Sequence, residues 1–165
     1  MVNTWPLQSD RAAMIERFGN PDANGDGAPD PKWVAEHLTT IVPPYTMFYG
    51  QTPIKRITCN KAIATPLLLS LAGILKLYGN ENEIRRHGMH NFSGCYNFRP
   101  KRGGSSLSMH AYGAAVDLDA ANNAFHSTKF TMPAAVVDIF ESNGAVWGGH
   151  WISPDAMHFQ WARVK

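Results

Sequence analysis

The sequence predicts a single α+β domain in which helices flank a small antiparallel sheet. Two apolar segments repeat their large residues with helical spacing, and two short segments alternate apolar and polar residues as strands do. The chain has 165 residues, of which 44% are hydrophobic, so it can build one substantial core and is short for two domains. We therefore expect residues 1–165 to form one domain.

The N-terminal region predicts a short helix followed by a long loop. Ser9 is expected to cap a helix that ends at Gly19 and carries three apolar residues at helical spacing, namely Met14, Ile15 and Phe18. Residues 20–31 are rich in Gly, Pro, Asp and Asn, which predicts a loop. The first residues, Met1–Pro6, have neither the basic nor the apolar region of a secretion signal, so we expect no signal peptide there.

Four residues of this loop fit the first half of a calcium-binding pattern: Asp22, Asn24, Asp26 and Asp30. The twelfth position of that pattern normally holds a bidentate Glu, and here it is Trp33. A plain cluster of turns is therefore the favoured interpretation, and a calcium site is kept as the alternative.

Two longer helices are predicted to have structural roles. Thr65–Pro66 resembles a cap and first residue, and the apolar face that follows runs to Gly79. The apolar stretch Ile63–Leu77 is interrupted too often, and is too short, to span a bilayer. The second helix is expected from Thr131–Pro133 to Gly144, with an apolar face made of Val136, Val137 and Phe140.

Two predicted strands carry ionisable residues opposite their apolar residues. Residues 113–119 direct Val116 and Leu118 to one face and Ala115, Asp117 and Asp119 to the other. Residues 157–161 direct Met157, Phe159 and Trp161 to one face and His158 and Gln160 to the other. Each strand therefore offers polar groups that could meet in one site.

Composition argues against nucleic-acid binding and against a metal-binding or disulfide role for the cysteines. The net charge of +2 is spread along the chain, which argues against a nucleic-acid-binding protein. Cys59 and Cys95 lack the spacing of a metal site and are too few for a disulfide framework, so we take both as ordinary thiols.

Only some of the seven histidines are candidates for chemistry. Four are expected to be structural or solvated: His37, His87, His90 and His126. His110 differs, because the strand after it carries only the small residues Gly113 and Ala115 before Asp117. We expect these small residues to leave room for a metal ion and a substrate beside the backbone.

The chemistry of His110, Asp117 and His158 suits a catalytic zinc site. Zinc hydrolases commonly use three protein ligands and leave the fourth position to water, whose pKa falls to about 7 on the metal. Asp155, three residues before His158, could move the proton of that water. From spacing alone, a buried His and a strand Asp with ordinary hydrogen-bond partners is an equally good interpretation.

Two sequence blocks resemble the signature blocks of the LAS zinc peptidases. They read S-M-H-A-Y-G-A-A-V-D at residues 108–117, and W-G-G-H-W followed by D-A-M-H-F-Q within residues 147–160. The family contains D-alanyl-D-alanine carboxypeptidases and dipeptidases, and L-alanyl-D-glutamate endopeptidases of phage endolysins. The resemblance spans about residues 58–161 and implies the hedgehog/D-Ala-D-Ala peptidase form of an α+β fold.

Carried over residue by residue, the resemblance implies the main site roles. His110, Asp117 and His158 would bind one zinc ion, and Asp155 would be the catalytic acid and base. Arg99 would steady the substrate carbonyl as it becomes an oxyanion, a role that suits an always charged donor.

Three further residues have roles that stay open. Ser108 would bond to substrate or near the metal, with capping of a turn as the alternative. His150 would lie around the ligands or at the rim of the site, where it could contact substrate or compete for metal. Asp119 could accept a hydrogen bond behind the ligands, although a solvated carboxylate is the favoured interpretation.

The resemblance implies a peptidoglycan peptidase that hydrolyses amide bonds of the stem peptide. We expect an L-alanyl-D-glutamate endopeptidase acting as a bacteriolytic phage endolysin, made in the host cytoplasm and reaching the cell wall after holin-type release. The expected protein is a monomer that binds neither nucleic acid nor membrane. The alternatives are a D-alanyl-D-alanine carboxypeptidase or dipeptidase and, since hedgehog domains share this fold, a non-catalytic zinc-binding module; Asp155 and Arg99 favour catalysis.

Overall fold

The computed structural model describes residues 4–165 and confirms the predicted α+β class. The helices are α1 (Arg11–Phe18), α2 (Pro31–His37), α3 (Lys61–Tyr78), α4 (Glu81–Arg86), α5 (Ala134–Ser142) and the 3-10 turn η1 (Gly148–His150). The strands are β1 (Leu38–Ile41), β2 (Met47–Tyr49), β3 (Thr52–Ile54), β4 (Ile57–Asn60), β5 (Phe92–Gly94), β6 (Ala115–Leu118), β7 (Val146–Trp147) and β8 (His158–Gln160). We expect no signal peptide in residues 1–6, and the first three of these lie outside the described residues.

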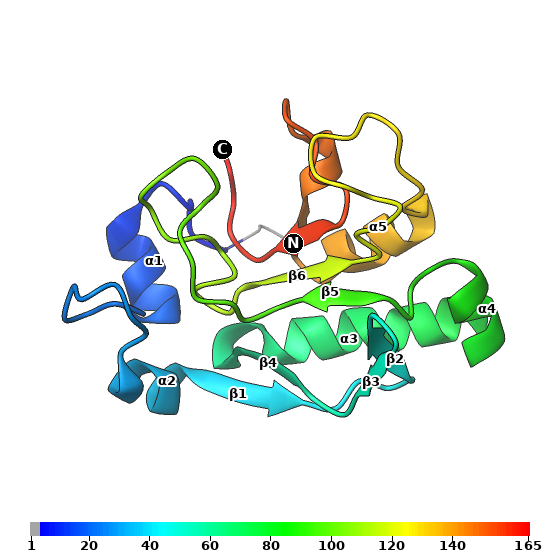
Figure 1. Ribbon diagram of the computed structural model, residues 1–165, viewed down its shortest axis with the longest axis horizontal. Coiled ribbons are helices and arrows are strands. Elements are labelled where there is room, and N and C mark those ends of the chain that lie inside the picture. Colours follow the sequence, from blue (N-terminus) through cyan, green and yellow to red (C-terminus); the bar gives the residue numbers. More distant parts are fainter. Residues whose placement is uncertain (1–3) are drawn as a thin grey trace.

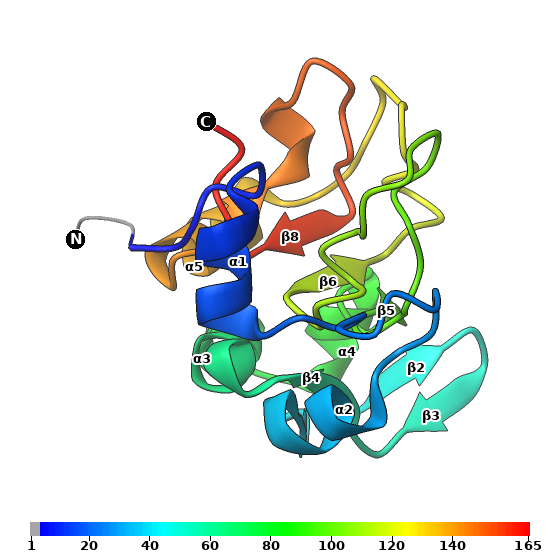
Figure 2. The same ribbon diagram turned by 90° about the vertical axis from the view of Figure 1, so that its left-hand side faces the viewer.

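The strands form three small antiparallel sheets around α3. One sheet has four strands in the order β5-β6-β8-β7, and β1–β4 and β2–β3 form separate pairs. In the view of Figure 1, α3 lies between the β1–β4 pair and the four-stranded sheet, and Figure 2 shows the same elements from the side. The buried side chains of α3 therefore lie at the centre of the core: Ile63, Leu67, Ser70, Leu71 and Ile74.

By length and composition, α3 would also suit a membrane span. Within residues 4–165 it is the one helix that is long and apolar enough, and core helices pass the same test. Leu71 and Ile74 are fully buried, whereas Leu69 is 54% exposed. The helix thus has one face in the core of this domain.

Three helices begin at residues other than those predicted, and in α1 and α3 the reason is a side-chain cap at a neighbouring residue. Asn60 caps α3, with its side-chain oxygen accepting a hydrogen bond from the amide of Ala62 at 3.0 Å. Pro66, predicted at the first helical position, therefore lies inside the helix. Asp10, rather than Ser9, caps α1, and α5 starts at Ala134 after an N-cap residue, Pro133, that makes no side-chain cap bond.

The candidate calcium loop forms a cluster of turns, as the favoured interpretation predicts. Asp30 caps α2, accepting hydrogen bonds from the amides of Lys32 and Trp33. The other acidic oxygens accept bonds from amides within the loop: Gly27 bonds to Asp22, and Ala28 bonds to Asp26. The same oxygens that the alternative interpretation gives to calcium thus organise the loop and the start of α2.

Both cysteines are buried free thiols. Burial raises the pKa of Cys59 to about 12 and raises that of Cys95 well above its usual value. Thiols in this state are unreactive at neutral pH, in agreement with the prediction that they are ordinary core residues.

Gly113 serves the fold rather than making room for a metal or substrate. Its φ is +64°, and a Cβ atom there would lie 2.9 Å from the backbone nitrogen of Asn60 and 3.0 Å from Leu38. The carbonyl of Gly113 also accepts a hydrogen bond from the amide of Asn60 at 2.8 Å. The small residue is needed because two backbone segments touch here.

Gly113→Ala should therefore lower the free energy of unfolding strongly. A positive φ alone costs an alanine about 1–2 kcal/mol, and the contact with Asn60 adds to that cost. The matched control is Gly25→Ala, because Gly25 has a φ of +73° with no atom near its would-be Cβ. Urea denaturation should show a clearly larger loss for Gly113→Ala, and equal losses would contradict the close-contact account.

Candidate metal centre

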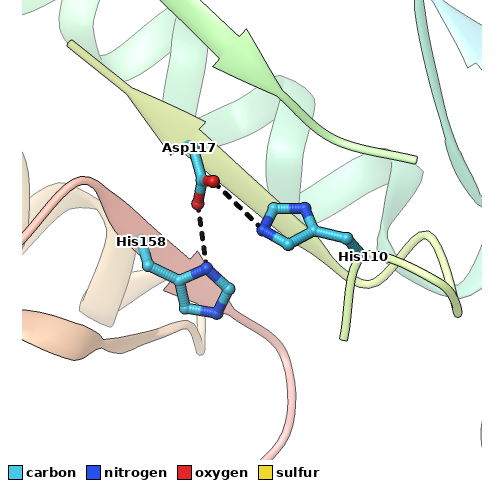
Figure 3. A group of neighbouring side chains, drawn as sticks. All are labelled: His110, Asp117 and His158. Carbon is cyan, nitrogen blue, oxygen red and sulfur yellow. Dashed lines mark hydrogen bonds and ion pairs between the residues drawn. The ribbon is translucent and has the colours of Figure 1, made fainter. Parts of the chain in front are cut away.

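The pairing of β6 with β8 brings two candidate ligands together. Asp117 lies directly opposite His158 in the antiparallel register, so their side chains project from the same face. His110 approaches from the turn before β6, where the amide of Gly113 bonds to the carbonyl of His110 at 2.9 Å. Figure 3 shows both imidazoles directed at the Asp117 carboxylate.

The three side chains are close enough to share one ion. Oδ1 of Asp117 lies 2.9 Å from Nδ1 of His158, and Oδ2 lies 3.2 Å from Nε2 of His110. One potential ligand atom from each residue falls within 4.8 Å of the other two. Within residues 4–165 this is the one such group of three or more His, Cys, Asp or Glu side chains.

Hydrogen bonding fixes the tautomer of His110, and thereby which ring nitrogen presents a lone pair to the carboxylate. Nδ1 lies 2.7 Å from the carbonyl oxygen of Cys95, which can only accept, so Nδ1 carries the hydrogen. In the neutral ring, Nε2 then carries a lone pair and no hydrogen. It is buried, and within the described chain it has no hydrogen-bond partner of acceptable geometry despite its nearness to Asp117.

A glutamine fixes the other imidazole in the same way. The amide nitrogen of Gln160 donates to the carbonyl of Ala162 at 2.8 Å and to Oε1 of Gln8 at 3.2 Å. Its oxygen therefore faces Nε2 of His158 at 3.1 Å and accepts the hydrogen from that nitrogen. Nδ1 of the neutral His158 is left as a lone pair toward Asp117.

Two lone pairs and a carboxylate facing one another require a positive charge between them. In the metal-free protein that charge is a proton. Burial lowers the pKa of His158, but the hydrogen bond and charge of Asp117 outweigh burial and raise the pKa. Burial raises the pKa of Asp117, but the two imidazoles outweigh it and hold the pKa well below its usual range. A metal ion would replace that proton, and two imidazoles with one carboxylate are donors that zinc prefers.

Asp155 lies beside this group in the same cleft, which has a volume of about 250 Å³. Its Oδ1 is buried and, within residues 4–165, has no hydrogen-bond partner. Burial raises the pKa of Asp155, and the nearby charge of Asp117 raises it further, against opposing effects of His158, His110 and Arg102. A carboxyl with a free oxygen and a raised pKa can exchange protons with a bound molecule.

The other predicted site residues lie in different surroundings. Arg99 is half-buried and lines the cleft, with Nη1 3.4 Å from the carbonyl of Pro100. Ser108 also lines the cleft, but its hydroxyl oxygen accepts a hydrogen bond from the amide of Ala111 at 3.3 Å, which is the turn-capping alternative. His150 is exposed, packs edge-on against Trp147 and is not among the residues that line the cleft.

The interpretation of Asp119 as a solvated carboxylate is wrong. Its exposed fraction is 2%, and it accepts hydrogen bonds from the side-chain amides of Asn91, Asn122 and Asn123. A Cβ atom at Gly88 would lie 2.5 Å from its Oδ2. Asp119 therefore organises the segment after β6 instead of facing water or the ligands.

Several cleft residues were not predicted. Lys101 and Arg102 lie close to Arg99 in the sequence, and this short run of cations was the signal that could have pointed to them. For Gln160, the alternation in β8 already predicted that its side chain shares a face with His158. Trp151 lines the cleft with a buried Nε1 that has no partner within residues 4–165. No local signal points to Gln8, because it is 152 residues away from Gln160 in the chain.

Comparison with known proteins agrees with this geometry. Residues 102–161 match the model of a family described as D-alanyl-D-alanine carboxypeptidase. This segment includes His110, Asp117, Asp155 and His158, and the match confirms over these residues the resemblance found in the sequence. Comparison with curated proteins and with solved structures returned no match.

Gln160→Met should weaken metal binding about 10- to 100-fold, because His158 loses the acceptor that fixes its ring and tautomer. Methionine keeps the length of the side chain without the hydrogen bonds. Zinc affinity would be measured by competition with a chromogenic chelator. Gln51→Met is the control, since Gln51 is exposed between β2 and β3. Equal affinities for the two variants would show that Gln160 does not position His158.

Proposed function

We propose that this protein is a zinc-dependent peptidase that hydrolyses an amide bond in the stem peptide of peptidoglycan. One observation carries the proposal: two imidazole lone pairs and a carboxylate converge in a cleft, beside Asp155, whose Oδ1 is buried and has no partner in the described chain. The family match over residues 102–161 supports a peptidoglycan peptidase as the class of enzyme.

His110, Asp117 and His158 would hold the metal through Nε2, a carboxylate oxygen and Nδ1, respectively. A bound zinc ion supplies a Lewis acid and lowers the pKa of water in its open position. The protein contributes the orientation of the ligands. The carbonyl of Cys95 and the side chain of Gln160 hold both rings so that their lone pairs point inward.

Asp155 would act as the base and then as the acid. It takes a proton from the attacking water at its carboxylate and returns it to the nitrogen of the departing amine. Its raised pKa favours the first transfer, because a carboxylate with a higher pKa is a stronger base.

Arg99 would stabilise the negative charge that develops on the substrate carbonyl oxygen. Its guanidinium is always charged and lies in the lining of the same cleft. The indole nitrogen of Trp151 is a second donor with no partner in the described chain, and we assign it to a carbonyl of the bound peptide.

The shape of the cleft favours an L-alanyl-D-glutamate endopeptidase over an enzyme that removes a terminal D-alanine. A second cleft, of about 480 Å³, shares Gln8, Lys101 and Met109 with the first. An extended groove suits a peptide that continues beyond the cleaved bond, whereas a carboxypeptidase needs a closed end. The proposal includes the role of a phage endolysin, a monomer that reaches the wall after holin-type release from the host cytoplasm.

The proposal is tested by mass spectrometry of purified peptidoglycan after digestion with the zinc-loaded protein, with a chelated sample beside it. We expect new free N-termini at D-glutamate. Release of D-alanine would instead indicate a carboxypeptidase. A lack of products from several wall types would favour a non-catalytic metal-binding module.

Two variants separate catalysis from metal binding in the same assay. Asp155→Ala should lower the rate of hydrolysis by several orders of magnitude while zinc stays bound, and His110→Ala should also lose zinc. The wild-type rate should fall toward acid pH as Asp155 is protonated and can no longer act as a base. An active Asp155→Ala protein would contradict the assignment of the base.

A further inference from the structure

Asp155 depends on its backbone for its position in the cleft. A base must keep its carboxyl free for water and substrate, and the buried Oδ1 of Asp155 has no hydrogen-bond partner within residues 4–165. The segment that carries it, residues 151–157, leads from η1 to β8 and belongs to no helix or strand. Contacts with neighbouring segments must therefore hold the base in place.

The first of these contacts is with Gly148 of η1. The amide of Asp155 bonds to the carbonyl of Gly148 at 2.9 Å. A Cβ atom at Gly148 would lie 2.5 Å from the carbonyl oxygen of Asp155, so the two backbones meet too closely for a side chain at this position. This contact supports Asp155 from one side only.

The second support is the segment between β6 and α5. The amide of His126 donates to the carbonyl of Pro154 at 2.8 Å, and the amide of Met157 donates to the carbonyl of Asn123 at 3.1 Å. Figure 1 shows the two segments side by side, the one before α5 in yellow and the one before β8 in orange. The two hydrogen bonds thus lie on either side of Asp155 in the sequence.

Asn123 is itself fixed by Asp119. Both side chains are buried. Nδ2 of Asn123 donates to the backbone carbonyl of Asp119 at 3.0 Å and to its Oδ2 at 3.3 Å, and Oδ1 of Asn123 accepts a bond from the amide of Thr131 at 3.0 Å. The carbonyl that receives the amide of Met157 is therefore held from behind by a buried carboxylate.

The backbone of this segment adopts an uncommon conformation at two residues. φ is +48° at Asp119 and +65° at His126. A left-handed backbone is unfavourable for most residues with a side chain, and it persists where surrounding contacts hold it. At Asp119 these contacts are hydrogen bonds to its carboxylate from the side-chain amides of Asn91, Asn122 and Asn123. The carboxylate therefore fixes the path of the chain toward Asn123 and His126.

We propose that Asp119 and Asn123 are positioning residues that hold the base, Asp155, in place. The carboxylate of Asp119 fixes Asn123, and the carbonyl of Asn123 holds the amide of Met157, two residues after the base. This inference rests on the proposed function, in which Asp155 exchanges protons with water and amine. Neither Asp119 nor Asn123 lines the cleft of the metal ligands, so both act through Asp155 and not on the substrate.

Other contacts hold the metal ligands. Asp117 and His158 are placed by the pairing of β6 with β8, and His110 is oriented by the carbonyl of Cys95. Loosening residues 151–157 should therefore slow the chemical step while zinc binding stays unchanged. This separation distinguishes a positioning role from general support of the fold.

The test is Asp119→Asn, which keeps the size of the side chain but puts an amide where the carboxylate accepts bonds from three asparagines. The substrate is the N-acetylated stem pentapeptide L-Ala-γ-D-Glu-L-Lys-D-Ala-D-Ala, which contains both candidate bonds, and mass spectrometry follows its hydrolysis by the zinc-loaded protein. We expect kcat to fall roughly 10- to 100-fold, because a small displacement of a catalytic group costs about that much. KM, and zinc affinity measured by chelator competition, should change little.

A second measurement does not depend on activity. Hydrogen exchange followed by NMR reports the protection of the amides of Met157 and His126, which bond across the two segments. The amide of Trp161, bonded to the carbonyl of Ala114 at 3.0 Å, is the internal reference. In Asp119→Asn, protection of Met157 and His126 should fall at least about tenfold relative to Trp161, because local opening exposes them.

The control is Asp30→Asn, which removes the same charge from a carboxylate that accepts bonds from the amides of Lys32 and Trp33 and lines neither cleft. If Asp119→Asn does not fold, Asn122→Ala replaces it. That variant removes one exposed donor and leaves the carboxylate in place, so it should shift both readouts in the same direction to a smaller extent.

An unchanged kcat in Asp119→Asn, a zinc affinity that falls together with kcat, or an equal effect of the control would overturn the positioning role. A wild type that hydrolyses neither candidate bond would overturn the proposed function. In that case, lost protection of Met157 and His126 would still support the hold of Asp119 on this segment, and unchanged protection would overturn it.

Discussion

The antiparallel pairing of β6 with β8 is the constraint on which the candidate site depends. This register sets Asp117 opposite His158, Val116 opposite Phe159 and Ala115 opposite Gln160. Because side chains alternate, a slip of one residue would bury Asp117 in the core and turn Val116 toward the cleft. Phe159 stacks on Phe140 of α5 with ring centres 4.1 Å apart, so core packing on one face fixes the chemistry on the other.

The site is assembled from segments far apart in the chain, although its ligands come from two short motifs. Cys95, at the end of β5, orients His110, and Gln8, near the N-terminus, reaches Gln160 and through it His158. The N-terminal segment is itself held along the C-terminal one, where the amide of Gln8 bonds to the carbonyl of Arg163. Folding of the whole domain therefore determines which nitrogens face the metal position.

Alternation in the two strands predicted the shared face of Asp117 and His158, because strand periodicity is local and strong. The N-terminal residue of α3 was harder to predict, because Asn60 and Thr65–Pro66 both suit a helix start. The side chain of Asn60 is fixed there by hydrogen bonds to the carbonyls of Phe18 and Tyr112, and these come from distant parts of the chain. Gly113 and Asp119 were misinterpreted for a similar reason. Their surroundings, Asn60 and three asparagines respectively, come from packing that no local pattern reports.

The central claim is that one zinc ion lies between Nε2 of His110, Nδ1 of His158 and the Asp117 carboxylate, in place of the proton that this arrangement otherwise requires. The most direct measurement is an anomalous difference map from crystals of the zinc-loaded protein, with data collected on either side of the zinc absorption edge. The account predicts one strong peak at bonding distance from these three atoms. A map with no peak there, or a peak only at other residues, would contradict it.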